Sequence, residues 1–223
     1  MKFIPKLFNT DMVKALIEGR KTQTRRTKGL KAINENPNWE YNKVYGHLVT
    51  GPQIFYFIDK QTGAMKPIKP EAYVGDVFWV RETSAPVTIG YAYKADGCYT
   101  ENNTVFKWKP SIFMPKDACR IFLEVTNIRV QKLKDISDND AEKEGVYFHS
   151  MPLSDTGDFC FYPKNYSISK KEADGWPYFK EGEGKESFLS LWESIYGKGS
   201  LESNPWIFAY NFKKIDKPEN FLI

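Results

Sequence analysis

The stretch Gly19-Arg20-Lys21-Thr22-Gln23-Thr24-Arg25-Arg26 joins an amphipathic segment to a polar, alternating one. Before it, Thr10 can cap a helix over residues 10–18, in which the apolar residues fall on one face. Gly19 stands where a left-handed residue would end that helix. Threonines then alternate with long polar side chains up to Thr27, which favours an extended strand. The sequence therefore predicts a helix, a glycine stop and a cationic strand in direct succession.

The alternation of side chains along a strand restricts which of these residues can meet. Successive side chains point to opposite faces. One face should therefore carry Lys21, Gln23 and Arg25, and the other should carry Thr22, Thr24 and Arg26. Lys21 can share a pocket with Thr24 and Arg26 only if it precedes the regular strand or lies at a bulge.

The remainder of the chain predicts a mainly antiparallel sheet with flanking helices. Strands are expected at residues 53–59, 77–82, 91–93, 105–108, 120–134 and 206–212. Helices are expected from Ser137 to Gly145 and from Ser187 to Tyr196, the first with a capping box that pairs Ser137 with Asp140. This order predicts one α+β domain over residues 1–223, built on a closed or nearly closed barrel with insertions at about 28–73 and 146–186.

Composition narrows the classes of partner. The net charge is +4, from 32 Lys and Arg against 28 Asp and Glu, which is far below the balance of a protein that follows long stretches of phosphate. The 3 cysteines are widely spaced and there are only 2 histidines, so neither a zinc site nor a disulfide is expected. No signal-peptide core and no apolar run of membrane-spanning length occurs, which predicts a cytoplasmic protein without a membrane partner. No organic cofactor is implied.

At the level of motifs, Gly19-x-Lys21-x-x-x-x-Arg26 resembles the GxKxxxxR motif of the ASCH family, a part of the PUA-like superfamily. The chain as a whole is similar to long ASCH proteins of phages and prophages. The stretches that carry this wider similarity are Lys21–Arg26, Gly75–Thr83, Lys109–Pro115, Asp135–Gly145 and Asn204–Trp206.

The resemblance implies a PUA-like β-barrel and a small set of functions. Family members include RNA-related proteins, proposed nucleic-acid modification factors and a few amidohydrolases. Small ASCH enzymes similar in this motif hydrolyse N4-acetylcytidine with a Lys, a Thr and a Glu, which fall on Lys21, Thr24 and Glu144. This chain is about twice as long as those enzymes, and its insertions could cover or reshape the pocket.

The residue types are also chemically coherent on their own. A lysine beside Arg20, Arg25 and Arg26 is repelled by charges of the same sign. This repulsion lowers its pKa and raises the fraction of the amine that is neutral and nucleophilic. Glu144 could transfer protons between an amine, a water and a leaving group, while Thr24 orients the nucleophile. The same cations and hydroxyl equally make an anion clamp without catalysis.

Four more residues are candidates for ligand binding: Arg81, Glu82, Ser111 and Trp206. Arg81 and Glu82 form a charged end to a buried strand, which indicates either a pocket or an ion pair. Ser111 could present a hydroxyl to a ligand or lie in a plain turn, and Trp206 could stack on a base. Three readings stay open: a module that binds a single-stranded nucleic acid, a modified base or a small nucleoside; an amidohydrolase; and a phage assembly protein. The oligomeric state is not determined.

Overall fold

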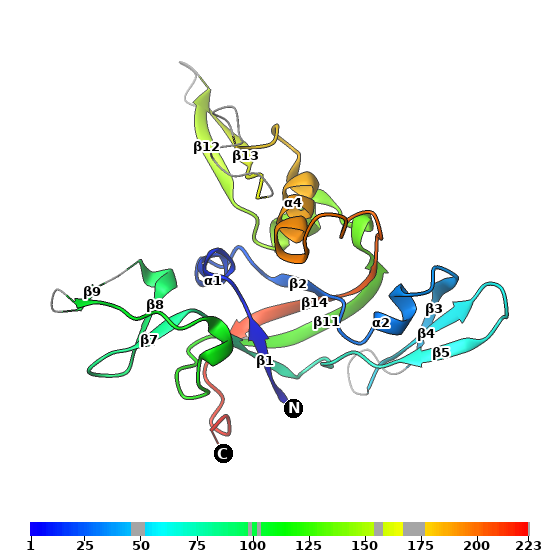
Figure 1. The fold of residues 1–223 in the computed structure, drawn as a ribbon, viewed down its shortest axis with the longest axis horizontal. Helices are drawn as coiled ribbons and strands as arrows, with labels where there is room; N and C mark the ends of the chain where they lie inside the picture. Colours follow the sequence, from blue (N-terminus) through cyan, green and yellow to red (C-terminus); the bar gives the residue numbers. More distant parts are fainter. Residues whose placement is uncertain (46–51, 98–99, 102–103, 154–157, 167–176, 223) are drawn as a thin grey trace.

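A computed structural model describes residues 1–45, 52–97, 100–101, 104–153, 158–166 and 177–222 (Figure 1). Its centre is a five-stranded sheet in the order β1 (Phe3–Leu7), β6 (Val77–Arg81), β11 (Phe122–Lys132), β14 (Trp206–Ile215) and β2 (Gln23–Arg26). All neighbouring pairs in it are antiparallel except β1 and β6. The predicted α+β class with mainly antiparallel strands is therefore confirmed.

The strand β1 has no counterpart in the prediction. Pro5 lies in its middle, and a proline removes a ladder hydrogen bond, which argues against a strand. β1 is an edge strand with β6 as its one neighbour in the sheet, and an edge position tolerates proline. The local sequence alone gives no sign of this parallel pairing, because it joins residues more than seventy positions apart.

The predicted closure of the barrel is not found among the described residues. β1 and β2 are the two edges of the sheet, and helix α1 (Thr10–Ile17) connects them (Figure 1). A side chain approaches across this seam: Arg26 on β2 directs Nη2 to the carbonyl oxygen of Leu7 on β1, at 3.4 Å. β2 has four residues, which pair with β14 on one side, and no strand of the described residues pairs with its other side, so the sheet stays open along the seam.

The other helices begin and end close to the predicted residues. α3 (Asp138–Lys143) is capped by the Ser137 side chain, which accepts a hydrogen bond from the Asp140 amide, and α4 spans Gly184–Tyr196. The cap of α1 is Asn9 rather than Thr10, since the Asn9 side chain accepts from the amide of Met12. Short helical segments complete the set: α2 (Lys31–Asn34), η1 (Lys94–Asp96), η2 (Ser111–Phe113) and η3 (Leu133–Asp135).

Both predicted insertions contain more strand than the sequence suggested. The first holds a three-stranded sheet of β3 (Trp39–Tyr45), β4 (Ile54–Asp59) and β5 (Met65–Ile68), where one strand, at residues 53–59, was expected. The second holds the hairpin of β12 (Phe148–Leu153) and β13 (Asp158–Pro163). Two smaller hairpins are β7 (Ser84–Pro86) with β8 (Tyr91–Tyr93), and β9 (Thr100–Glu101) with β10 (Thr104–Val105), so the strand predicted at 105–108 is nearly absent. In Figure 1 the hairpins project from the central sheet in different directions.

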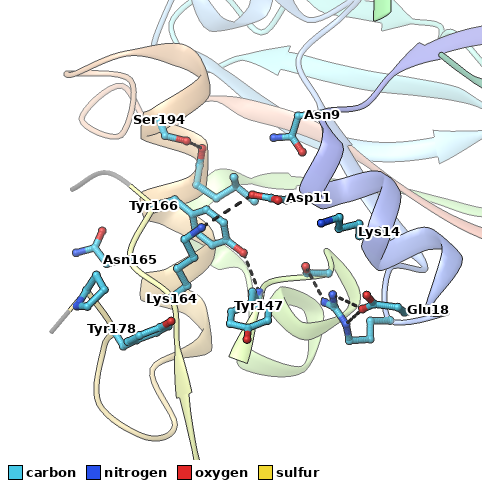
Figure 2. Close-up of a pocket in the computed structure, with 14 residues that line it drawn as sticks. Asn9, Asp11, Lys14, Glu18, Tyr147, Lys164, Asn165, Tyr166, Tyr178 and Ser194 are labelled. Carbon is cyan, nitrogen blue, oxygen red and sulfur yellow. Dashed lines mark hydrogen bonds and ion pairs between the residues drawn. The ribbon is translucent and has the colours of Figure 1, made fainter. Parts of the chain in front are cut away.

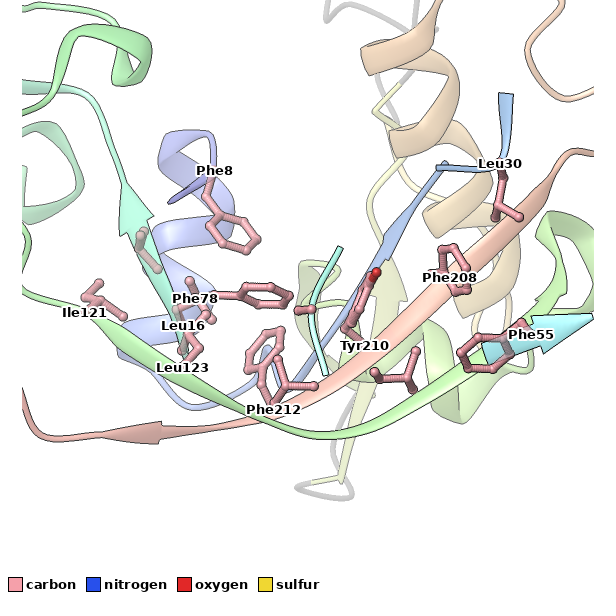
Figure 3. Close-up of a cluster of buried hydrophobic side chains, with 14 of the residues drawn as sticks. Phe8, Leu16, Leu30, Phe55, Phe78, Ile121, Leu123, Phe208, Tyr210 and Phe212 are labelled. Atoms are coloured by element: carbon pink, nitrogen blue, oxygen red, sulfur yellow. The ribbon is translucent and has the colours of Figure 1, made fainter. Parts of the chain in front are cut away.

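The main hydrophobic core lies between the central sheet and the elements that cover it (Figure 3). Phe78, Leu123 and Tyr210 from the sheet pack with Leu16 of α1 and with Phe55 of β4. The first insertion therefore shares one core with the sheet. A second cluster joins α3 and α4 to β14 through Ala141, Phe188, Trp192, Ile207 and Ala209. None of the helices in the described part of the chain is long and apolar enough to cross a membrane.

Candidate functional site

Glu144 is the centre of a buried group of charges. Its carboxylate accepts a hydrogen bond from Lys21 Nζ at 2.8 Å on one oxygen and from Arg25 Nη1 at 2.8 Å on the other. The same Lys21 amine donates to the backbone carbonyl of Glu144 at 2.7 Å. The side chains of Lys21 and Arg25 are fully buried and that of Glu144 is 3 % exposed. The carboxylate is therefore held between two cations with almost no contact with solvent.

Asp140 extends this group by one turn of α3. It accepts from Arg25 Nη2 at 3.0 Å and from Arg129 of β11 at 2.9 Å. Gln23 approaches the same carboxylate at 3.4 Å and also accepts from Arg25. The neighbouring Arg129 and Arg25 lower the pKa of Asp140 despite the opposing effect of burial. Arg25 is thus fixed in position by three acceptors.

Local backbone geometry brings Lys21 to Glu144. After Gly19 ends α1 with φ +77°, the amide of Lys21 bonds to the carbonyl of Ala15, and the amide of Thr22 bonds to Lys143 at the end of α3. Gly145 has φ +82°, and a Cβ there would lie 2.8 Å from the Cβ atoms of both Ala15 and Lys21. Only glycine allows this close approach.

Thr24 lies on the other face of β2. Its hydroxyl accepts a hydrogen bond from Arg26 Nη1 at 2.6 Å, and Arg26 also donates to the carbonyl of Arg25 at 2.8 Å. Lys21, Gln23 and Arg25 all contact α3, as the predicted alternation requires. Lys21 precedes β2, yet it keeps the strand parity. The structure therefore joins Lys21 to Glu144 but places Thr24 with Arg26.

A cavity of about 540 Å³ lies against this group, at the open seam between β1 and β2, and we call it the seam cavity. Arg25, Arg26 and Glu144 line one side, and Leu7 and Phe8 line the side of β1. Aromatic and aliphatic residues of α4 form an apolar wall: Phe188, Leu191, Trp192, Ile195 and Tyr196. Its volume is that of a small-molecule site, with few polar groups in an apolar surround.

Two features of the buried charges bear on what the seam cavity can bind. Burial lowers the pKa of Lys21, while the Glu144 carboxylate opposes the shift, and Arg26 and Arg25 add to it. The Nε–H of Arg25 is buried and has no acceptor among the described residues. A buried donor without a partner is costly, so an acceptor that a ligand supplies would stabilise this arrangement.

The predicted residues Ser111, Arg81 and Glu82 make different contacts, and of these three Ser111 alone lines the seam cavity. Ser111 of η2 lines the seam cavity. Arg81 does not line it: its Nε donates to the carbonyl of Met114 at 3.1 Å, and its Nη2 donates to the carbonyl of Ile112. Arg81 thus fixes the segment that carries Ser111. Glu82 pairs with Arg120 at 2.9 Å, and this arginine also binds Asp96.

Trp206 and Arg20 lie outside the seam cavity. Trp206 is half-buried where β14 meets the first insertion, and its ring contacts Tyr41 and Phe57 while its Nε1 donates to the carbonyl of Trp39. Trp206 does not line the seam cavity, so its ring is not placed to stack on a base held there. Arg20 pairs with Glu18 and donates to the carbonyls of Gly145 and Val146.

Sequence reasoning missed the residues that complete the cavity. Phe8 follows the unpredicted strand β1, and its ring lies 5.7 Å from Lys21 Nζ and 5.4 Å from the Arg26 guanidinium. Phe188 lies 5.3 Å from the Arg25 guanidinium. The apolar face of α4 was recognised, but its spacing signals burial and does not reveal that part of the face borders a cavity.

Within the described ranges no group of three or more His, Cys, Asp or Glu side chains could hold a metal ion. Comparison with models of protein families, with curated proteins and with solved structures found no match to this chain. The seam cavity and its charges are therefore the basis for assigning a function.

Proposed function

We propose that the protein is an ASCH-type binding module whose seam cavity holds a single nucleobase, either unpaired in a nucleic acid or in a nucleoside. One observation carries the proposal: Glu144, Arg25 and Arg26 line the cavity together with aromatic residues of α4. Aromatic faces stack on bases, while carboxylates and guanidinium groups bind their hydrogen-bonding edges. The resemblance of Gly19–Arg26 to the GxKxxxxR motif supports the same proposal.

The arrangement of donors and acceptors selects among bases. A carboxylate offers about four acceptor sites, and Lys21 and Arg25 occupy one on each oxygen of Glu144. The remaining sites can accept from the exocyclic amine of a base. Arg26 can donate to a neighbouring ring nitrogen or carbonyl, and so can Arg25, whose Nε–H lacks an acceptor among the described residues. An amine beside an acceptor is the pattern of cytosine and of adenine.

The test is a calorimetric titration with cytidine and with uridine, which carries a carbonyl in place of the amine. We expect cytidine to bind about tenfold tighter or more, since a mismatched base edge costs ~1–3 kcal/mol. Glu144→Gln should reduce cytidine binding and remove the preference. Glu142→Gln is the matched control, because Glu142 is exposed on the same helix. Equal binding of the two nucleosides to wild-type protein would rule out the proposed recognition.

A second candidate is hydrolysis of an amide on an acylated base amine, as in N4-acetylcytidine. The specific observation is that Lys21, with its lowered pKa, bonds to Glu144, which lines the cavity. Glu144 would take a proton from the attacking water and pass it to the departing amine, so that an amide and water give a carboxylic acid and the free base. Thr24 would act only through Arg26, to which it is bonded.

Chromatography of N4-acetylcytidine incubated with the protein tests this candidate. Release of cytidine that Lys21→Met and Glu144→Gln abolish, and that Lys31→Met leaves unchanged, would establish the hydrolase. Lys31 is an exposed lysine of α2 and serves as the control. Binding of N4-acetylcytidine without any release of cytidine would leave the binding module as the function.

A further inference from the structure

A second cavity, of about 720 Å³, lies beside the first and is called here the insertion cavity (Figure 2). Lys14 and Asp11 of α1 line one side, and Lys164 and Tyr166 of the second insertion line another. Residues of α4 complete the wall. The seam cavity and the insertion cavity share two lining residues, Asn9 and Leu191, so they lie next to each other on the two sides of this pair.

The walls of the insertion cavity combine cations with tyrosine rings. Lys14, Arg20 and Lys164 line it together with Tyr147, Tyr166 and Tyr178. Figure 2 shows the Lys14 side chain directed from α1 towards the space between α1 and the insertion. In the described part of the chain no carboxylate lies within ion-pair distance of the Lys14 amine. Lysines beside aromatic rings are typical of sites that bind single-stranded nucleic acids.

Arg20 is already paired with Glu18, but the existing contacts across the insertion cavity leave Lys14 and Lys164 available. Lys164 reaches Asp11 at 3.9 Å, and both side chains are partly exposed. Such a long, solvated pair contributes little, so a phosphate can replace Asp11 as the partner of Lys164. Tyr166 accepts a hydrogen bond from the amide of Tyr147 at 2.8 Å, and burial raises the pKa of Tyr166 to about 12. Its hydroxyl therefore stays protonated and able to donate to a phosphate oxygen.

We propose that the insertion cavity binds the nucleotide next to the base held in the seam cavity, so that the ligand is a single-stranded polynucleotide rather than a free nucleoside. The phosphate between the two nucleotides lies near Asn9, within reach of Lys14 and Lys164, and the second base stacks on a tyrosine ring. This inference rests on the proposed function of the seam cavity. It assigns the second insertion the task of extending the site by one nucleotide.

The experiment compares cytidine, which carries no phosphate, with hexamers of cytidylate, as RNA and as DNA, by calorimetry and fluorescence anisotropy. We expect at least one hexamer to bind about tenfold tighter than the nucleoside. Lys14→Ala and Tyr147→Ala should each weaken hexamer binding about fivefold and leave cytidine binding unchanged. Lys14→Ala should also make hexamer binding less sensitive to salt. Lys31→Ala, the control, should change the affinity for neither ligand.

The outcomes separate this inference from the proposed function. A hexamer that binds no tighter than cytidine, or whose binding Lys14→Ala and Lys31→Ala weaken equally, overturns the inference and leaves base binding intact. A hexamer that requires Lys14 and Tyr147 but is indifferent to Glu144→Gln supports the insertion cavity and overturns the proposed function. Absence of binding by either ligand overturns both.

Discussion

Glu144 and Glu82 are both almost completely buried, yet they lie in different kinds of site. Glu82, just after β6, is 1 % exposed and is neutralised by Arg120, whose side chain is 29 % exposed and also binds Asp96. Glu144 accepts from two cations that are themselves fully buried, and it borders a cavity. The surroundings of the partner cations, rather than the burial of the carboxylate, therefore distinguish the structural ion pair of Glu82 from the candidate binding group Glu144.

The physical reason lies in the cost of moving charges out of water. Arg120 keeps part of its hydration, so its pair with Glu82 has a smaller desolvation penalty than a fully buried pair. Through Glu82 and Asp96, Arg120 also connects the end of β6 to η1. The side chains of Lys21 and Arg25 have no contact with solvent. Their ion pairs with Glu144 and Asp140 offset the loss of hydration. Buried charged groups that border a cavity are often part of a functional site, and the group around Glu144 is of this kind.

The largest effect is expected for Glu144→Ala. The substitution leaves Lys21 and Arg25 buried without their shared carboxylate, and breaking a buried ion pair in this way costs ~3–5 kcal/mol. Glu82→Ala should cost less, about 1–3 kcal/mol, because Arg120 retains Asp96 and water. Urea denaturation of the two variants measures both losses. A larger loss for Glu82→Ala would contradict the distinction between the two carboxylates.

Gly145→Ala should come next, through the backbone that presents Glu144. The left-handed conformation costs an alanine ~1–2 kcal/mol, and forcing a Cβ against Ala15 and Lys21 adds about 1–3 kcal/mol. Gly182→Ala is the matched control, because Gly182 has the same φ of +82° but no atom of the described residues lies within 4 Å of an added Cβ. Thermal unfolding should show a larger loss for Gly145. Equal losses would mean that the approach of α3 to Lys21 is not tight.

The smallest effect is a dependence on pH at Glu82. Burial raises the pKa of Glu82 above 4.5, with Arg120 opposing the shift. As pH rises from about 4.5 through the folded pKa, the native state binds more protons than the unfolded chain, so the free energy of unfolding falls. Glu82→Gln lacks this change. The stability of wild-type protein relative to the variant should therefore decline over that window in urea titrations, and a rise would contradict the direction of the shift.

Much of the site was readable from local sequence. The alternation in Lys21–Arg26 correctly placed Lys21, Gln23 and Arg25 on one face, because side chains in an extended chain alternate whatever surrounds them. The Ser137 cap and the Gly145 stop were equally local, so α3 and the position of Glu144 at its end could be predicted.

Residues whose surroundings come from distant segments could not be assigned in this way. Trp206 is of a residue type that stacks on bases, but its ring packs against Tyr41 of β3 and Phe57 of β4, away from the seam cavity. Arg81 has the charge of a ligand contact, but it is used to hold η2. The residues that Trp206 and Arg81 contact are distant in the sequence, so no local periodicity predicts these contacts.

The sequence by itself determined the helices and strands around Gly19–Arg26, the parity of its side chains and the set of charged groups available for chemistry. These depend on residues within a few positions of one another. Only the tertiary structure decided that β1 and β2 remain separate edges, and that a cavity opens at their seam against Glu144. That outcome depends on the packing of α3 on α4 and on the close approach of Gly145 to Ala15 of α1, and such packing of distant segments leaves no local pattern in the sequence.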